Sequence, residues 1–164
     1  MELLLRHQLT KNFFGWIAYS LSKSERVYPG TDTWALHPLD QPHNLIVIAS
    51  YKLPYDIIAG VRIRYATGSL DTPYLGAIYD ANGNYYYPLI GPLFSHRLPP
   101  FFQMDVRIDK RFVFNRWMLS LYADVQNVTN RQNVEGVAYN FNYTDQNYIY
   151  GIPILPALGI RGEF

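Results

Sequence analysis

The segment FFQMDVRIDKRFVFNRWMLSLYADVQ, which spans residues 101–126, decides the fold that the sequence predicts. Its apolar and polar side chains alternate with the period of two that is typical of a β-strand. One face of its first half carries Phe102, Met104, Val106, Ile108, Phe112 and Phe114. The opposite face carries Gln103, Asp105, Arg107, Asp109 and Arg111. In its second half, Trp117, Leu119, Leu121, Ala123 and Val125 alternate with Ser120, Tyr122, Asp124 and Gln126.

The length of these two strands indicates a membrane. Each has about ten residues, which is the length that crosses a bilayer when the strand is tilted. Phe112, Phe114 and Trp117 cluster at the short turn Asn115–Arg116 between the strands. Aromatic side chains favour the membrane–water interface, so we expect these three to form an aromatic girdle on the periplasmic side.

Five further segments continue the pattern: residues 2–9, 13–24, 43–53, 57–66 and 155–164. In the fourth of these, Ile57, Ala59, Val61, Ile63 and Tyr65 alternate with Gly60, Arg62, Arg64 and Ala66. The alternation is imperfect in 43–53, where Ile46 and Ile48 lie on the face expected to be polar. The sequence therefore predicts seven long strands, and no stretch predicts a helix of three turns.

Short and long connections alternate along the chain. The short ones fall at residues 10–12, 54–56 and 115–116, and the long ones at about 25–42, 70–100 and 128–154. This asymmetry is typical of an antiparallel up-and-down transmembrane β-barrel with short periplasmic turns and long extracellular loops. We expect the polar segment 134–150 to form a hairpin that projects into water. The alternative is that it supplies an eighth strand and closes a small barrel.

The number of strands indicates a partial barrel. Bacterial single-chain barrels have an even number of strands, and seven is odd. An open sheet edge is unfavourable in lipid, because each backbone group without a hydrogen-bond partner there costs several kcal/mol of free energy. Residues 1–7 do not resemble a secretory signal peptide. We therefore expect residues 1–164 to be one partial β-barrel domain, an internal or C-terminal piece that pairs with strands located elsewhere.

Composition narrows the functional classes. The 164 residues include 15 Tyr, 9 Phe and 3 Trp, only 16% are charged, and the net charge of +1 gives no reason to expect nucleic-acid binding. The absence of cysteine excludes disulfides and thiolate metal sites. No apolar run approaches the roughly 20 residues of a transmembrane helix.

Three stretches carry a resemblance to a known family: GWIAYSLSKSER (Gly15–Arg26), RLPPFFQMDVRIDKRFVFNRWMLSLYADVQNVTNR (Arg97–Arg131) and PALGIRGEF (Pro156–Phe164). Together they resemble the C-terminal third of a TonB-dependent outer-membrane receptor. The resemblance implies a 22-stranded barrel in the bacterial outer membrane, of which these would be the last seven strands. It also implies import of a ligand such as a siderophore, carbohydrate or peptide. The family's plug domain and TonB-contacting box are not among these residues, so the TonB complex would act only through a plug supplied elsewhere.

Two sets of candidate site residues lie on the predicted strands. We expect the barrel-assembly machinery to recognise an insertion signal in the last strand, formed by Leu158, Ile160 and Phe164. We expect a lumen-facing set that contacts a plug or a water-filled channel: Arg62, Arg64, Asp105, Arg107, Asp109, Asp124 and Arg161. In that set, Asp124 is expected to pair with Arg107 or Arg161. The alternative is a merely solvated sheet face held by cross-strand ion pairs.

A third set lies in the long loops. Trp34, Tyr74, Tyr79, Tyr85, Tyr86 and Tyr87 are candidates for ligand contact, because rigid aromatic rings with a polar edge suit recognition. Packing of the loops over the barrel mouth would explain them as well.

We expect no catalytic residue, metal or cofactor. Asp105 and Asp109 lie on one face, but the intervening Arg107 would neutralise them, and His37, His43 and His96 lack the spacing of metal ligands. Three other hypotheses about the function stay open. They are a small autonomous outer-membrane barrel with a structural or adhesion role, an outer-membrane enzyme with its site in the loops, and a soluble lipid- or sugar-binding β protein.

Overall fold

A computed structural model describes residues 1–7, 10–28, 30 and 32–164. Within them the chain is all-β, and every paired strand is antiparallel to its neighbour. This part of the chain contains no helix of the length and apolar character needed to span a membrane. The predicted strand 2–9 and the connection 25–42 include residues 8, 9, 29 and 31, which lie outside the described residues.

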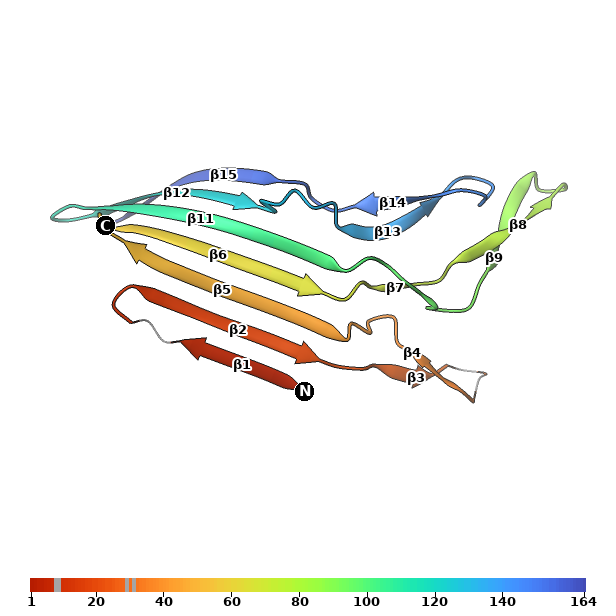
Figure 1. The fold of residues 1–164 in the computed structure, drawn as a ribbon. Helices are drawn as coiled ribbons and strands as arrows, with labels where there is room; N and C mark the ends of the chain where they lie inside the picture. The colour runs from red at the N-terminus through yellow and green to blue at the C-terminus, as the bar shows by residue number, and fades with distance from the viewer. Residues whose placement is uncertain (8–9, 29, 31) are drawn as a thin grey trace.

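Seven long strands form one sheet, in the order β1-β2-β5-β6-β11-β12-β15 (Figure 1). They are β1 (Glu2–His7), β2 (Phe13–Leu21), β5 (His43–Leu53), β6 (Ile57–Ala66), β11 (Phe101–Val113), β12 (Met118–Gln126) and β15 (Leu155–Glu163). The predicted seven long antiparallel strands are confirmed. The sheet is open, and β1 and β15 are its two edges.

All short turns lie at one end of the sheet and all long connections extend from the other (Figure 1). Between β5 and β6, Tyr55 and Asp56 both adopt positive φ angles, of 64° and 54°. Two consecutive positive φ angles give a tight hairpin whose twist matches that of the flanking strands. The predicted alternation of short and long connections is therefore confirmed.

The long connections contain eight short strands that the sequence reasoning did not predict individually. They form four two-stranded sheets: β3 (Glu25–Val27) with β4 (Trp34–Leu36), β7 (Leu70–Asp71) with β10 (His96–Arg97), β8 (Tyr74–Asp80) with β9 (Tyr85–Ile90), and β13 (Val134–Tyr139) with β14 (Gln146–Tyr150). Segment 134–150 is thus the predicted hairpin. The alternative in which it adds an eighth strand to the main sheet is wrong.

The strand register confirms the two predicted faces. Asp105 lies directly opposite Arg62 of β6, and Arg62 lies opposite Ile48 of β5. One residue further along, Val106 lies opposite Val61 on one side and Val125 on the other. Because directly opposed residues share a face, odd-numbered residues of β11 lie on one face of the whole sheet and even-numbered residues on the other.

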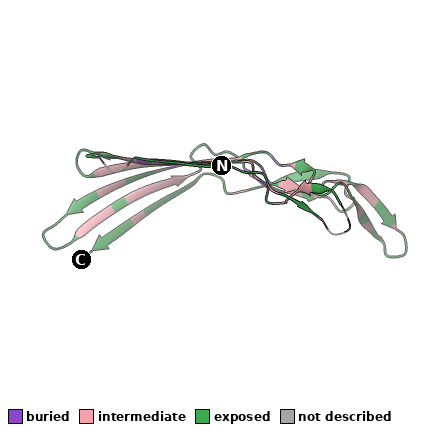
Figure 2. Ribbon diagram, turned by 90° about the horizontal axis from the view of Figure 1, so that it is seen from below, coloured by how far each residue is buried: buried purple, intermediate pink, exposed green. Residues whose placement is uncertain are grey.

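The sheet has no second layer. Among the described residues, the buried side chains are Leu98 and four polar ones, namely Asp40, Asp105, Asn127 and Asn133. Intermediate and exposed residues run along all seven strands (Figure 2). The chain exposes 11721 Å², whereas a compact protein of 19.1 kDa exposes about 8,400 Å². Both faces of the sheet are therefore available to surroundings other than the chain itself.

Candidate functional site

The polar face of the sheet is organised around the carboxylate of Asp105. Arg62 donates to Asp105 Oδ2 from Nε at 2.9 Å and from Nη2 at 2.7 Å. Oδ1 of the same carboxylate accepts from Gln103 Nε2 at 2.7 Å and from the Asn127 backbone N–H at 2.9 Å. Asp105 is only 7% exposed and accepts four hydrogen bonds. Its charge is thus neutralised locally, and its role is to join β6, β11 and the end of β12.

A second ion-pair group lies further along β11 towards the short turns. Arg107 donates from Nε and Nη2 to the two carboxylate oxygens of Asp109, at 2.9 and 2.8 Å. Its Nη1 lies 3.8 Å from Asp124 Oδ2, and its guanidinium carbon lies 4.1 Å from the centre of the Tyr122 ring. The expectation that Arg107 neutralises both carboxylates is wrong, because Arg62 pairs with Asp105 and Arg107 pairs with Asp109.

Asp124 has one of its two predicted partners. Arg107 lies directly opposite Asp124 in the register, as expected. Arg161 instead lies opposite Ser120 and pairs with Glu163 on its own strand, at 2.8 Å. The predicted alternative pair of Asp124 with Arg161 is wrong, because Ala157 lies opposite Asp124 and Arg161 is four residues further along β15.

Arg64 extends the polar face towards the long loops. Its Nη2 donates to Gln103 Oε1 at 2.8 Å, and its guanidinium carbon lies 5.5 Å from the centre of the Phe101 ring. Its Nε is buried without a hydrogen-bond partner. Arg64 lines a polar cavity of about 110 Å³ together with Asn133 and Glu135 of the third long connection.

A hollow of about 350 Å³ lies on the sheet between Arg62 and Arg107. Its lining includes Gly60, Ser50 and Ile48. A Cβ atom added at Gly60 would approach no heavy atom closer than 3.8 Å, so the hollow is open above position 60. The arrangement can accept a side chain from an element that covers the face.

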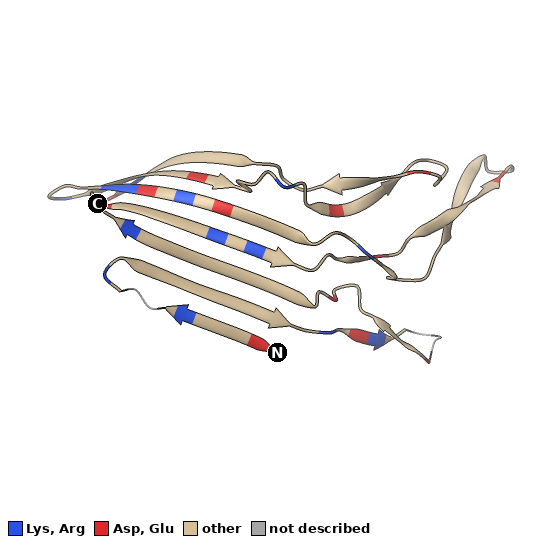
Figure 3. Cartoon of the chain, in the orientation of Figure 1, with Lys and Arg blue, Asp and Glu red and all other residues tan. Residues whose placement is uncertain are grey.

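The charges are distributed unevenly over the polar face. They are concentrated on β6, β11, β12 and β15, whereas β2 carries none, β5 carries only Lys52 at its end, and β1 carries Glu2 and Arg6 near its two ends (Figure 3). The register places six apolar residues on this face of β1, β2 and β5: Leu4, Phe14, Trp16, Ala18, Ile46 and Ile48. The sequence reasoning did not predict this apolar half of the face. The imperfect alternation at Ile46 and Ile48 was the feature of the sequence that indicated it.

The opposite face of the sheet is apolar in its middle. The register places three residues with a basic side chain on it, and all three lie near strand ends: His7, His43 and Lys110. Lys110 bonds the backbone carbonyl of Tyr55 in the β5–β6 turn. At the other end, Tyr19 Oη lies 2.7 Å from His43 Nδ1. We call this surface the outer face and the Asp105 side the inner face.

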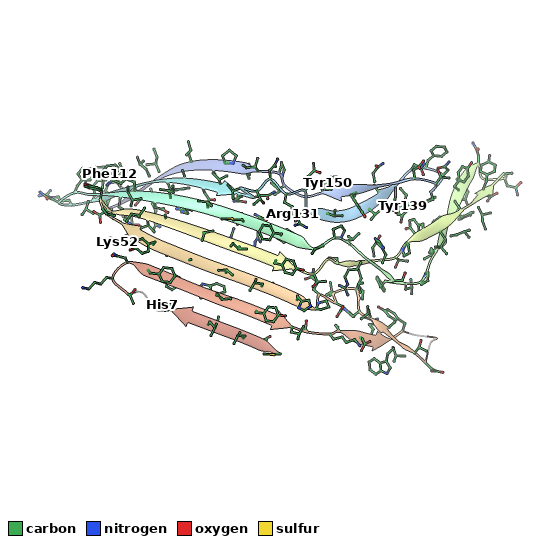
Figure 4. The ribbon with its side chains drawn as sticks, in the orientation of Figure 1. His7, Lys52, Phe112, Arg131, Tyr139 and Tyr150 are labelled. Carbon is green, nitrogen blue, oxygen red and sulfur yellow. The ribbon has the colours of Figure 1, made fainter. Side chains whose placement is uncertain are left out.

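Aromatic side chains border the outer face at both ends. At the short-turn end, Trp117 stacks on Phe114 with ring centres 4.5 Å apart and on Phe164 at 6.0 Å. Near the long connections, Tyr19 and Tyr65 occupy one row of the register with Phe102. Phe112 marks the first end in Figure 4, and the loop residues Tyr139 and Tyr150 lie beyond the second. The predicted short-turn cluster exists, and the second aromatic row was not predicted.

The predicted insertion residues are on the outer face of the edge strand. Leu158 lies opposite Ala123 and Ile160 opposite Leu121, and both are highly exposed. Phe164 follows the end of β15 and stacks on Trp117. Thus Leu158, Ile160 and Phe164 share one apolar surface.

Buried polar residues tie the long connections to the sheet. Arg97 donates to Asp40 Oδ2 at 2.6 Å and to the backbone carbonyls of Asp40 and Gly68, at 2.7 and 2.8 Å. Asn127 donates to the carbonyls of Arg131 and Ile152, at 3.0 and 3.1 Å. Sequence reasoning missed both anchors. Their partners lie up to 57 residues away, and no local pattern identifies them.

The loop aromatics divide into packed and open residues. Tyr74 packs against Tyr139 and Tyr143 of the third connection, with ring centres 4.7 and 5.2 Å apart. Tyr86 contacts Tyr79 at 5.0 Å and Phe141 at 5.8 Å. These contacts support the packing interpretation for Tyr74 and Tyr86. Four of the six candidates have exposed side chains: Trp34, Tyr79, Tyr85 and Tyr87.

The described residues include no group of three His, Asp or Glu side chains placed to hold a metal ion. Comparison of the chain with protein-family models, curated proteins and solved structures gives no match in any of the three. The assignment of a function therefore depends on the two faces of the sheet and on its loops.

Proposed function

We propose that the chain forms part of the wall of a β-barrel in a bacterial outer membrane, with its outer face against lipid and its inner face towards the lumen. The observation that carries the proposal is the outer face itself. It is an apolar surface of seven strands that has basic side chains only near its ends and aromatic rows at both borders. Outer-membrane barrels have this pattern on their lipid-facing side.

The dimensions of the outer face support the proposal. Phe102 and Phe112 belong to its two aromatic borders and are ten residues apart on β11. Ten residues of antiparallel strand extend about 34 Å, which becomes about 25 Å along the barrel axis at a tilt of 35–45°. The apolar band of outer-membrane barrels is about 25 Å tall.

The edges of the sheet support a larger barrel. Each neighbour in the seven-stranded sheet is antiparallel, so β1 and β15 run in the same direction and do not form an antiparallel pair with each other. Unpaired backbone groups in lipid cost several kcal/mol each. An odd number of further strands between the two edges would complete an even-stranded barrel.

The specific barrel that we propose is a TonB-dependent receptor, of which this chain is the C-terminal part. The resemblance of Arg97–Arg131 and Pro156–Phe164 to that family supports this step. In such a receptor, the charged half of the inner face would contact the plug domain, and the TonB complex would act through that plug. The long connections would contact an imported ligand. The barrel-assembly machinery would recognise the last strand, and the chain would have no enzymatic role.

Cysteine labelling tests the proposal directly, because the chain has no cysteine of its own. Single cysteines at Asn82 in the β8–β9 turn and at Asn115 in the β11–β12 turn mark the two ends of the sheet. The chain is produced in a bacterial host together with the strands that complete its barrel, and the cells are treated with a membrane-impermeant maleimide. We expect Asn82→Cys to react on intact cells and Asn115→Cys to react only after the outer membrane is permeabilised.

A third variant, Ile108→Cys in the middle of the outer face, serves as the depth control. It should resist the polar maleimide in both conditions and should react after denaturation. Equal labelling of all three cysteines on intact cells, or recovery of the chain without membranes, would refute a membrane-spanning arrangement.

A further inference from the structure

The β8–β9 hairpin has two faces with different surroundings. The register pairs Tyr79 with Tyr86 on one face, and Ile78 with Tyr87 and Asp80 with Tyr85 on the other. The first face is turned towards the third long connection, since Tyr86 contacts Phe141. Tyr74, at the base of the hairpin, packs on Tyr139 and its backbone N–H donates to the Tyr139 hydroxyl at 3.4 Å. These contacts hold the hairpin in place and leave its second face open, while Tyr79 on the first face is also 50% exposed.

Tyr85 and Tyr87 are the principal feature of the open face. They are 43% and 49% exposed, and their ring centres lie 4.4 Å apart in an edge-to-face arrangement. The Tyr85 ring lies over Gly83, where an added Cβ atom would be 2.1 Å from it. Gly83 therefore leaves the space that the Tyr85 ring occupies. The two rings are supported by the hairpin and by each other, and they remain accessible to a ligand.

The hairpin offers no cationic side chain to a ligand. Residues 74–90 contain five tyrosines and a single charged residue, Asp80. Its Oδ1 accepts from the backbone N–H groups of Asn82 and Gly83, at 2.9 and 3.2 Å, and so closes the turn. A site for an anionic chelate or a phosphate needs cationic side chains, and arginine most often supplies them. The open face has none.

The groups beside the two rings can pair with hydroxyl groups. The register places the Asp80 carboxylate opposite Tyr85 and the apolar Ile78 opposite Tyr87 on the open face, whereas Asn84 accepts a hydrogen bond from Tyr79 of the other face, at 2.8 Å. Phenolic hydroxyls donate and accept hydrogen bonds, and a carboxylate accepts them. Exposed ring faces pack against the C–H groups of a flat apolar surface. A sugar ring has such a surface and is bordered by hydroxyl groups.

We propose that the open face of the β8–β9 hairpin binds a neutral oligosaccharide, with sugar rings packed on Tyr85 and Tyr87. The inference rests on the proposed function only for the location of the hairpin, because the proposed function places the hairpin outside the cell. The inference deepens the proposed function by giving the chemical class of the ligand.

The test uses the full chain folded into detergent micelles and titrated with defined probes. Maltohexaose, cellohexaose and xylohexaose are the neutral probes, hexagalacturonate is the anionic probe, and a hexaproline peptide is the non-sugar probe. Binding is followed by saturation-transfer NMR of the probe. We expect at least one neutral oligosaccharide to bind and the anionic sugar and the peptide to bind at least tenfold more weakly.

The variants separate ring packing from hydrogen bonding. Each aromatic contact is worth about tenfold in affinity, so Tyr85→Ala with Tyr87→Ala should weaken the neutral sugar by about a hundredfold. Tyr85→Phe with Tyr87→Phe should retain most of the affinity. Tyr51→Ala with Tyr65→Ala, on the outer face of the sheet, is the matched control and should leave sugar binding unchanged.

Three results would overturn the inference: no binding of any neutral probe, equal binding by the double alanine variant, or preference for the anionic probe or the peptide. These outcomes are distinct from failure of the proposed function. A chain that passes the cysteine-labelling test and binds no sugar refutes the inference alone. A chain that binds sugar but is recovered without membranes refutes the membrane proposal alone.

Discussion

The inner and outer faces of the sheet are built from the same seven strands and differ only in which alternate residues they carry. On the inner face, Asp105 accepts four hydrogen bonds and Arg107 is shared between Asp109 and Asp124. On the outer face, directly opposed residues such as Val61 and Val106 are apolar. Since neither face is covered by another part of the described chain, the proposed function assigns them two different surroundings, one polar and one apolar.

The largest expected effect comes from placing a charge on the outer face. Val61 lies in the middle of β6, and an arginine at the middle of a lipid-facing strand costs about 2–4 kcal/mol. We expect Val61→Arg to lower the free energy of unfolding from lipid vesicles by about that amount. Urea titration followed by far-ultraviolet circular dichroism measures it.

The adjacent residue provides the matched control. Gly60 lies on the inner face beside the open hollow, so Gly60→Arg should change the same free energy by less than about 1 kcal/mol. Equal losses in the two variants would mean that the two faces do not have different surroundings.

The next effect concerns the inner face. Asp105→Ala removes the acceptor of four hydrogen bonds and leaves the Asn127 N–H without its partner, which costs about 1–3 kcal/mol. Arg62 is about half exposed and regains water, which keeps the loss below that of a fully buried pair. Urea titration of the folded chain measures the difference.

Asp124→Ala is the comparison for Asp105→Ala. The Asp124 carboxylate lies 3.8 Å from Arg107, and Arg107 keeps Asp109 as its partner. Asp124→Ala should therefore lower the free energy of unfolding by less than about 1 kcal/mol. A larger loss for Asp124 than for Asp105 would contradict the view that Asp105 organises this face.

A smaller effect is expected at the short-turn border of the outer face. Trp117→Ala removes the ring between Phe114 and Phe164 and should cost about 1–2 kcal/mol. Trp34→Ala is the control, because Trp34 is 72% exposed on the short strand β4. This variant should change the free energy of unfolding by no more than about 0.5 kcal/mol. Similar values for both would show that the aromatic stack does not stabilise the border.

Local patterns in the sequence were sufficient for the seven long strands and for the two faces of β11 and β12. The period-two alternation of 101–126 assigned each side chain of β11 and β12 to a face, because adjacent residues of a strand point in opposite directions. Short turns between such segments made the neighbours antiparallel. These features depend on residues that are close in the chain.

The parts that could not be predicted depend on residues that are distant in the chain. The apolar half of the inner face emerges only when Trp16 of β2 is aligned with Ile48 of β5, which requires the register. The Asp40–Arg97 pair joins two loops across 57 residues. The separation of Tyr86 from Tyr85 and Tyr87 depends on which face of one hairpin meets Phe141 of another.

The smallest effect is expected at Arg161, on the inner face of the edge strand. Arg161 and Glu163 lie 2.8 Å apart, but their side chains are 72% and 46% exposed, so water and salt screen the pair. Arg161→Gln should change the free energy of unfolding by less than about 0.5 kcal/mol, in low and in high salt alike. A salt-dependent loss above about 1 kcal/mol would indicate a desolvated pair. It would then place Arg161 under a covering element, and the charged half of the inner face would extend to the edge of the sheet.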